Sequence, residues 1–143
     1  MITLERVVVV DKPVDRVAAF LCDFTTTNDW DPGTVRTERT EGDGGPGTVY
    51  RNISRFAGRE TELTYVVEEL APGERITLRG ENRTVVAHDT MTFRGNGETA
   101  EVTYLAEFEF RGIARLLEPL LRLPMRKLGD DAERGMREAL NRL

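Results

Sequence analysis

Apolar residues recur every three or four positions through the last 33 residues of the chain, from Arg111 to Leu143. That spacing places side chains along one face of a helix, so it predicts a single long C-terminal helix whose apolar stripe is buried. Pro119 and Pro124 lack an amide donor and crowd the preceding turn, so we expect a kink or a short break between Leu117 and Met125. The stripe comprises Ile113, Leu116, Leu117, Leu120, Leu121, Met125, Leu128, Ala132, Met136, Ala139, Leu140 and Leu143.

Alternating apolar and polar residues predict strands in the rest of the chain. The β-branched stretch from Ile2 to Val10 predicts a first strand, and a short helix from about Pro13 to Cys22 follows it. A second short helix or turn is expected from Asp23 to Trp30. Turn residues then separate six further expected strands. These strands are Val35 to Glu41, Gly47 to Phe56, Glu60 to Leu70, Arg75 to Gly80, Val85 to Phe93 and Ala100 to Phe110.

The order of these elements predicts an α+β fold. The connections between strands are too short for parallel crossovers, so the strands should form an antiparallel meander. A strongly twisted sheet with one long helix across its concave face would bury the apolar faces of both. We therefore expect residues 1–143 to form a single domain. Its curved antiparallel sheet of about seven strands would wrap around the C-terminal helix, with two short helices after the first strand.

Composition argues against several classes of function. The net charge of −5 and the pI near 5.0 give no broad basic field, so we do not expect nucleic-acid binding. One cysteine and one histidine leave little for a metal site, and we expect neither a metal nor a cofactor. No apolar run approaches the ~18 residues that span a bilayer. The N-terminus also lacks a signal-peptide pattern. We expect a soluble, cytoplasmic protein. The sequence does not decide between a monomer and a homodimer.

A set of short motifs adds a family resemblance to this pattern. The motifs are Val10, Pro13, Val17, Phe20, Asp23, the run Asp29-Trp30-Asp31-Pro32, Gly47-Thr48, the turn from Glu68 to Gly73, Thr103-Tyr104 and the amphipathic last helix. With these residues the chain resembles the START-like helix-grip superfamily (SRPBCC), which includes polyketide cyclases and dehydrases and lipid-transfer proteins. The resemblance covers nearly the whole chain and implies an apolar ligand cavity between the sheet and the long helix. A shared fold does not name the ligand.

Such a cavity is mostly apolar, with a few polar groups that orient the ligand. The alternation along the strands places Tyr65, Asp89 and Tyr104 on the inward, apolar face. A carboxylate among apolar residues has a raised pKa and can act as a general acid or base, so these three are the candidate catalytic residues. The expected ligand-binding residues are Trp30, Leu63, Tyr65, Leu78, Asn82, Met91, Phe93, Tyr104, Phe108, Leu117, Leu121, Met125 and Leu128.

The polar candidates also have a purely structural interpretation. Asp89 could instead pair with Arg79 or Arg83, and this interpretation is favoured because most carboxylates lie in exposed pairs. The two tyrosines could be core residues whose hydroxyls reach water. His88 has the opposite parity to Asp89 and should face solvent. Both parities are apolar in residues 49–56, so the pattern leaves open which of these side chains face inward.

Three functions are compatible with the expected fold and cavity. The leading hypothesis is binding of a small hydrophobic molecule, aromatic, polyketide-like or lipid-like, in the cavity. The second is a polyketide aromatase/cyclase or dehydrase in which Asp89 and Tyr65 or Tyr104 transfer protons. The third is a protein-interaction module, such as a chaperone-activating or antitoxin-like partner. No Ser/His/Asp or Cys/His arrangement is evident, so we do not expect hydrolysis by an activated nucleophile.

Overall fold

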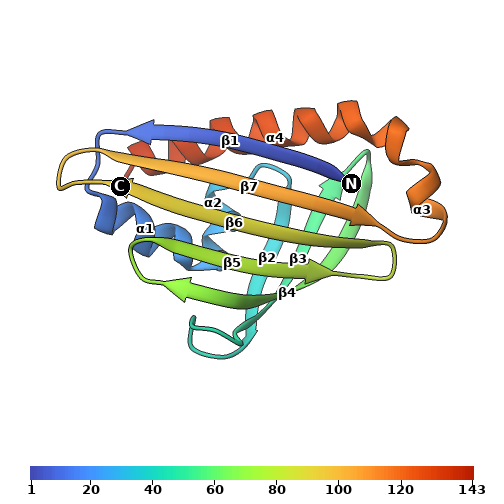
Figure 1. The fold of residues 1–143 in the computed structure, drawn as a ribbon, viewed down its shortest axis with the longest axis horizontal. Coiled ribbons are helices and arrows are strands. Elements are labelled where there is room, and N and C mark those ends of the chain that lie inside the picture. Colours follow the sequence, from blue (N-terminus) through green and yellow to red (C-terminus); the bar gives the residue numbers. More distant parts are fainter.

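The computed structural model describes all residues, 1–143, and has the predicted α+β helix-grip fold. A long helix lies along a curved sheet, and two short helices follow the first strand (Figure 1). The strands are β1 (Ile2–Val10), β2 (Thr34–Glu41), β3 (Val49–Phe56), β4 (Arg59–Ala71), β5 (Arg75–Glu81), β6 (Val85–Gly95) and β7 (Ala100–Phe110). The helices are α1 (Val14–Cys22), a 3-10 turn (Phe24–Thr26), α2 (Thr27–Trp30), α3 (Ile113–Leu116) and α4 (Glu118–Asn141).

The seven strands form one sheet in the order β1-β7-β6-β5-β4-β3-β2. Every neighbouring pair is antiparallel, which confirms the predicted meander from β2 to β7. The first strand returns to pair with the last, so β1 and β2 are the two edges. Register shifts interrupt the pairing of β2 with β3 and, between Val67 and Glu69, of β4 with β5. Such bulges bend strands and increase their twist, which produces the concave face that the helix covers.

Helix α4 comes into close contact with the rest of the fold at two glycines. A Cβ atom at Gly129 would lie 3.0 Å from the Arg6 guanidinium and 3.3 Å from Leu4, both on β1. At Gly135 a Cβ atom would overlap the backbone carbonyl oxygen of Trp30 and press against Pro32. These contacts hold α4 against β1 at one point and against the end of α2 at the other.

The predicted burial of the C-terminal stripe is correct for its second half and wrong for its beginning. Met125, Met136, Ala139 and Leu140 are buried in α4. By contrast, the apolar side chains from α3 through the first turn of α4 are largely exposed. The reason is that α3 projects past the end of the sheet, so the sheet does not cover this segment (Figure 1).

The helix is interrupted within the expected interval, at its beginning. Leu117 separates α3 from α4, and the first turn of α4 contains Pro119, where a missing amide hydrogen breaks no helical hydrogen bond. Pro124 lies inside α4. None of the helices is both long enough and apolar enough to cross a membrane.

Replacing Gly135 by alanine tests the close approach of α4. In an open helix this change stabilises by about 1 kcal/mol because alanine has the higher helix propensity. At Gly135 the added Cβ would collide with backbone, so we expect a loss of about 2 kcal/mol in the free energy of unfolding. Urea denaturation measures the free energy of unfolding of the variant. Gly97→Ala is the control, because its Cβ would meet open space. A stabilised Gly135→Ala variant would show that α4 does not pack closely against the end of α2 at this position.

Candidate functional site

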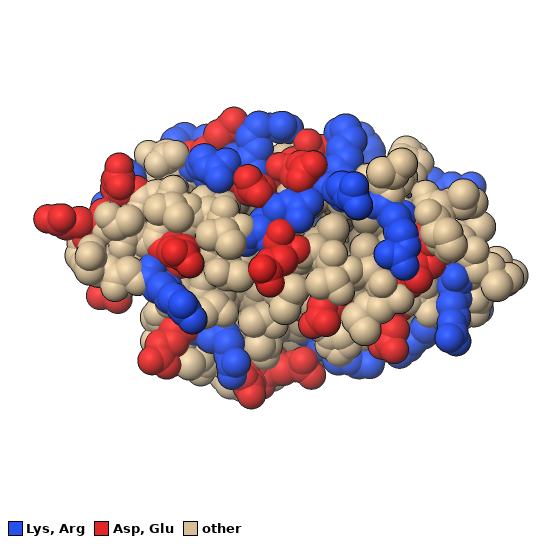
Figure 2. Space-filling model, turned by 45° about the horizontal axis from the view of Figure 1, so that its top comes forward, with Lys and Arg blue, Asp and Glu red and all other residues tan.

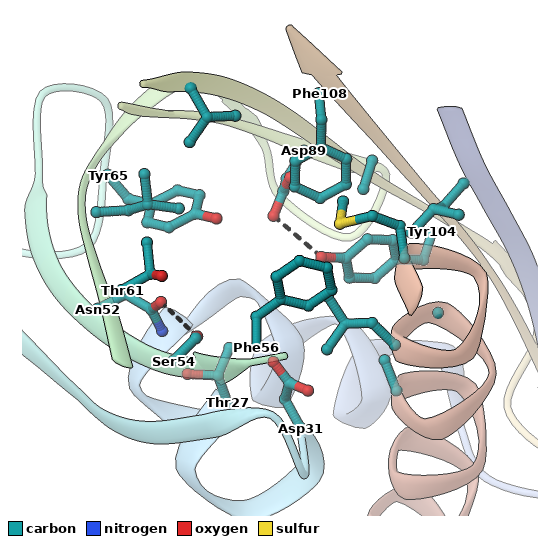
Figure 3. Close-up of a pocket in the computed structure, with 18 of the residues that line it drawn as sticks. Thr27, Asp31, Asn52, Ser54, Phe56, Thr61, Tyr65, Asp89, Tyr104 and Phe108 are labelled. Carbon is teal, nitrogen blue, oxygen red and sulfur yellow. Dashed lines mark hydrogen bonds between the residues drawn. The ribbon is translucent and has the colours of Figure 1, made fainter. Parts of the chain in front are cut away.

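A cavity of about 290 Å³ lies between the concave face of the sheet and α4. Of its 29 lining residues, 18 are hydrophobic, which is typical of a site for an apolar small molecule. Aromatic rings and a methionine lie around the space, and several side-chain oxygens point into it (Figure 3). Its apolar wall includes Leu4, Val8, Leu63, Ala106, Phe108 and Phe110 from the sheet and Leu121, Met125, Leu128 and Met136 from α4.

The cavity opens toward the end of the molecule where α3 lies. Its lining there includes Arg55 and Thr84, which are exposed, and Phe56 and Ala114, which are half-buried. These residues come from the end of β3, the turn before β6 and α3. The opposite end is closed by buried residues, among them Phe24. A ligand would therefore enter between the turns of the sheet and the start of the C-terminal helices.

Asp89 is the most perturbed carboxylate of the cavity. It points inward from β6, as the strand alternation predicts, and its side chain is almost completely buried. Burial raises the pKa of Asp89 from 3.8 to about 7, because a charged carboxylate is poorly solvated among apolar groups. A hydrogen bond that the Tyr104 hydroxyl donates to Oδ2 over 3.0 Å opposes this shift, and the negative charge of Asp31 adds to it. The carboxyl group is therefore poised to exchange a proton near neutral pH.

Two tyrosines bring their hydroxyl groups to the same part of the cavity. Tyr104 lies beside Asp89, and the Tyr65 hydroxyl points toward them from the other wall (Figure 3). Burial raises the pKa of both phenols, and the nearby Asp89 carboxylate raises it further, so both remain protonated. Tyr104 donates to Asp89, and the Tyr65 hydroxyl is available to donate to a ligand. The Tyr65 ring lies flat on Gly80 of β5, where a Cβ atom would come within 2.5 Å of the ring. Gly80 thereby sets the position of the Tyr65 hydroxyl.

Two buried polar atoms on cavity residues have no hydrogen-bond partner. They are the Asp89 Oδ1 atom, an acceptor, and the Trp30 Nε1 atom, a donor. The Trp30 ring contacts the Tyr104 ring edge-on at a centroid distance of 5.7 Å, and Tyr104 also bonds to Asp89, so both residues are neighbours of Tyr104. Unpaired buried groups cost free energy and are uncommon in folded proteins. A buried acceptor and a buried donor are thus left without partners beside Tyr104.

A second polar group lies on the wall formed by β3 and α2. Asn52 accepts a hydrogen bond from the Ser54 hydroxyl over 2.8 Å and donates one to the Thr37 hydroxyl over 2.8 Å. The Thr27 and Thr37 hydroxyl oxygens are 2.7 Å apart and continue this network. All three of Thr27, Asn52 and Ser54 line the cavity. Because the network is internally satisfied, it is a rigid polar surface rather than a set of free donors.

The structure brings many of the predicted site residues together and leaves others away from the cavity. Trp30, Leu63, Tyr65, Asp89, Tyr104, Phe108, Leu121, Met125 and Leu128 line it. Leu78, Met91 and Phe93 are packed in the core, outside the cavity wall. Asn82 caps the turn before β6, where its side-chain oxygen accepts from the Thr84 and Val85 amides. Leu117 is exposed at the break before α4.

The favoured interpretation of Asp89 as an exposed, arginine-paired carboxylate is wrong. Arg79 instead pairs with Glu81 over 2.7 Å on the outer face, and Asp89 forms its hydrogen bond with Tyr104. The reason is the strand alternation, which turns Arg79 and Asp89 to opposite faces of the sheet. His88, on the other side of β6 from Asp89, is half-buried and does not line the cavity.

Sequence reasoning missed several lining residues. Thr27, Asn52, Ser54, Phe56 and Thr61 are examples that no motif or parity argument selected. In β3 the signal was present but ambiguous, because Asn52 and Ser54 share one parity while apolar side chains occupy both. Asp31 also lines the cavity, where burial raises its pKa and its carboxylate accepts from Gly33 and Thr34. No group of three or more His, Cys, Asp or Glu residues could hold a metal ion.

Comparisons with known proteins agree with this architecture. The family described as "Polyketide cyclase / dehydrase and lipid transport" matches residues 1–143. A search of curated proteins finds no match. Among solved structures, the ZhuI aromatase/cyclase from Streptomyces sp. R1128 is 19% identical with a TM-score of 0.79, covering 97% of this chain and 90% of that one.

Two further structures have the same fold. TTHA0849 from Thermus thermophilus is 16% identical with a TM-score of 0.81, covering 96% of both chains. A START superfamily protein from Mycobacterium smegmatis is 14% identical with a TM-score of 0.74, covering 97% of this chain and 94% of that one. At these identities the likeness extends to the fold and not to the chemistry of the site.

The raised pKa of Asp89 predicts a specific pH dependence of stability. Ionisation costs more in the folded state than in the unfolded chain, so stability falls as pH rises from 3.8 to about 7 and then stays reduced. The full loss is on the order of 4 kcal/mol. Asp89→Asn cannot ionise, so from about pH 4 to about pH 8 its stability relative to wild type should rise by this amount.

Urea denaturation across that pH range measures the difference. Glu109→Gln is the matched control, since Glu109 is exposed on β7 and its replacement should leave the pH dependence unchanged. If the free energy of unfolding varied with pH in the same way for wild type and Asp89→Asn, the raised pKa of a buried Asp89 would be contradicted.

Proposed function

Because the chain belongs to the polyketide cyclase/dehydrase and lipid transport family, we propose that it binds a small hydrophobic molecule between the sheet and α4. The observation that carries the proposal is the mostly apolar cavity of about 290 Å³, in which a few polar groups converge. That combination is the usual composition of a small-molecule site. The apolar wall would supply the affinity, and the polar corner around Asp89 would set the orientation.

The size and polarity of the cavity narrow the ligand. A cavity of about 150 Å³ holds one benzene ring, so about 290 Å³ has room for two or three fused rings or a short acyl chain. The unpaired atoms of Trp30 and Asp89, with the Tyr65 hydroxyl, favour a ligand that carries a hydroxyl or keto oxygen at one end. An aromatic, polyketide-like molecule meets both requirements. A free fatty acid fits less well, because its carboxylate would lie beside Asp89.

A monohydroxy-anthraquinone is a suitable probe for this site. Trp30, the only tryptophan, lines the cavity, so quenching of its fluorescence reports binding directly. Ala106→Phe would place a ring in the cavity beside Met125. Because the ring occupies space that the ligand would fill, the ligand loses apolar contact, and we expect binding to weaken by about tenfold or more. Circular dichroism and urea denaturation establish that the variant folds.

The matched control is Ala19→Phe, the same change at an exposed position of α1, which should leave the affinity unchanged. A folded Ala106→Phe variant that binds the probe as tightly as wild type would place the ligand elsewhere.

A second function, aromatase/cyclase or dehydrase activity, is favoured by the geometry at Asp89. A carboxyl with a pKa of about 7 beside the Tyr104 hydroxyl can accept a proton at neutral pH and return it. In an aldol closure, Asp89 would remove a proton from a methylene between two ketones. The resulting carbanion would attack a third, more distant carbonyl of the chain, so that a carbon–carbon bond closes the ring, and the protonated Asp89 would return its proton to that carbonyl's oxygen. Loss of water from this hydroxyl and the neighbouring carbon would then form a double bond in the ring, while Tyr65 and Tyr104 donate hydrogen bonds to the ketone oxygens.

Asp89→Asn separates this activity from simple binding. With a linear poly-keto thioester as substrate, ring closure is followed by the absorbance of the aromatic product. We expect kcat to fall about a hundredfold or more and KM to change little, because the amide keeps its shape and loses only the proton transfer. Glu109→Gln serves again as the control. Unchanged turnover in Asp89→Asn would remove Asp89 from the reaction and leave binding as the function.

A further inference from the structure

Five large aliphatic side chains lie exposed on the segment that joins the sheet to the long helix. Their exposed fractions are 79% for Ile113, 79% for Leu116, 47% for Leu117, 74% for Leu120 and 72% for Leu123. We call these five residues the α3–α4 patch. Single exposed apolar residues are common, whereas five within eleven positions mark an interaction surface.

The helix carrying the patch is apolar on two sides. One side, with Leu121, Met125 and Leu128, lines the cavity, and the other side faces solvent with Leu120 and Leu123. A helix face that carries several large apolar side chains is normally buried. The fold provides a cover for one side only, so the other side is expected to meet a partner.

Basic side chains surround the patch. Residues 111–127 carry five basic and one acidic side chain, a net charge of +4 in a chain of net charge −5, so the remainder carries −9. The single acid, Glu118, is neutralised by the N-terminal amine over 2.6 Å and by Arg122 over 3.5 Å. Arg115 and Arg126 are exposed and form no ion pair. At the right of Figure 2, uncharged surface is bordered by several basic side chains.

We propose that the α3–α4 patch docks on an anionic lipid bilayer, with the mouth of the cavity against the membrane surface. Exposed leucines and isoleucine bordered by arginines are the composition of helices that lie in a membrane interface. The cationic border matches the negative surface potential of anionic lipids, and each basic residue near the surface adds about 1 kcal/mol of attraction. Ala114, between Ile113 and Leu116 of the patch, lines the cavity, so the patch and the mouth adjoin.

Other partners fit the patch less well. A second copy placed patch to patch would bring the two basic borders together, and like charges in contact are unfavourable. Interfaces between proteins usually depend on aromatic anchors that fill pockets. This surface is instead wholly aliphatic, and it projects from the end of the sheet (Figure 1). A fluid bilayer demands no such shape complementarity.

Docking in this orientation would let an apolar ligand move between bilayer and cavity without crossing water. This delivery step rests on the proposed ligand binding, but the docking itself does not. The test therefore uses the full chain without ligand, co-sedimented with vesicles of phosphatidylcholine alone or mixed with phosphatidylglycerol. We expect sedimentation with the anionic vesicles only, weakened by added salt.

Two pairs of substitutions assign the binding to the patch. We expect each of two double variants to lower the vesicle-bound fraction about tenfold or more. One combines Leu116→Glu with Leu120→Glu, and the other combines Arg115→Glu with Arg126→Glu. The matched control is Val9→Glu with Val35→Glu, which changes two exposed valines of the sheet and should bind vesicles like wild type. Because all these side chains are exposed, the variants should keep the wild-type free energy of unfolding.

The inference is overturned if wild type sediments with neither kind of vesicle, or if the leucine variant binds them as well as wild type. It is also overturned if analytical ultracentrifugation finds a dimer that the leucine variant dissociates, since a second copy would then cover the patch. Anthraquinone binding, followed by Trp30 fluorescence in the same variants, keeps the two proposals apart. Retained probe affinity with lost vesicle binding places the defect at the patch and not in the cavity.

Discussion

The distance between α4 and the sheet is the constraint on which the rest of the structure depends. Gly129 and Gly135 let the helix come close to β1 and to the end of α2, because a side chain at either position would meet neighbouring atoms. Along the rest of its inward face the helix carries long side chains, such as Met125, that face a sheet curving away from it. The cavity lies between the inward face of the helix and the concave sheet, and Gly129 itself lines it.

The same arrangement explains why a single carboxylate dominates the chemistry of the site. Asp89 stands on a central strand, covered by the helix layer, where little water can solvate its charge. Tyr104 offsets part of that cost by one hydrogen bond, which also fixes the rotamer of the carboxyl group. The site is therefore organised before any ligand arrives, and its donors and acceptors need not reorganise during binding.

Much of the fold followed from the sequence, because strand alternation and turn chemistry are local signals. The limits of β1 and β7 were predicted to the residue. Strand parity also pointed Asp89 inward, although the exposed, arginine-paired interpretation was favoured over it. Periodicity could not reveal that the stripe from Ile113 to Leu120 passes the end of the sheet, because the extent of a sheet is a tertiary property. Likewise Asn52 was missed, since both faces of its strand are apolar and only the three-dimensional curvature decides which one is concave.

The position of the Asp89 pKa near 7 has a thermodynamic consequence for any occupant of the cavity. An apolar molecule that displaces water from around the carboxyl group would raise the pKa further, so the complex would take up a proton that the free protein had released. Occupancy and proton uptake would then be linked, with affinity rising as the surroundings become more acidic. A small drop in local pH, as occurs beside an anionic surface, would favour loading of the cavity.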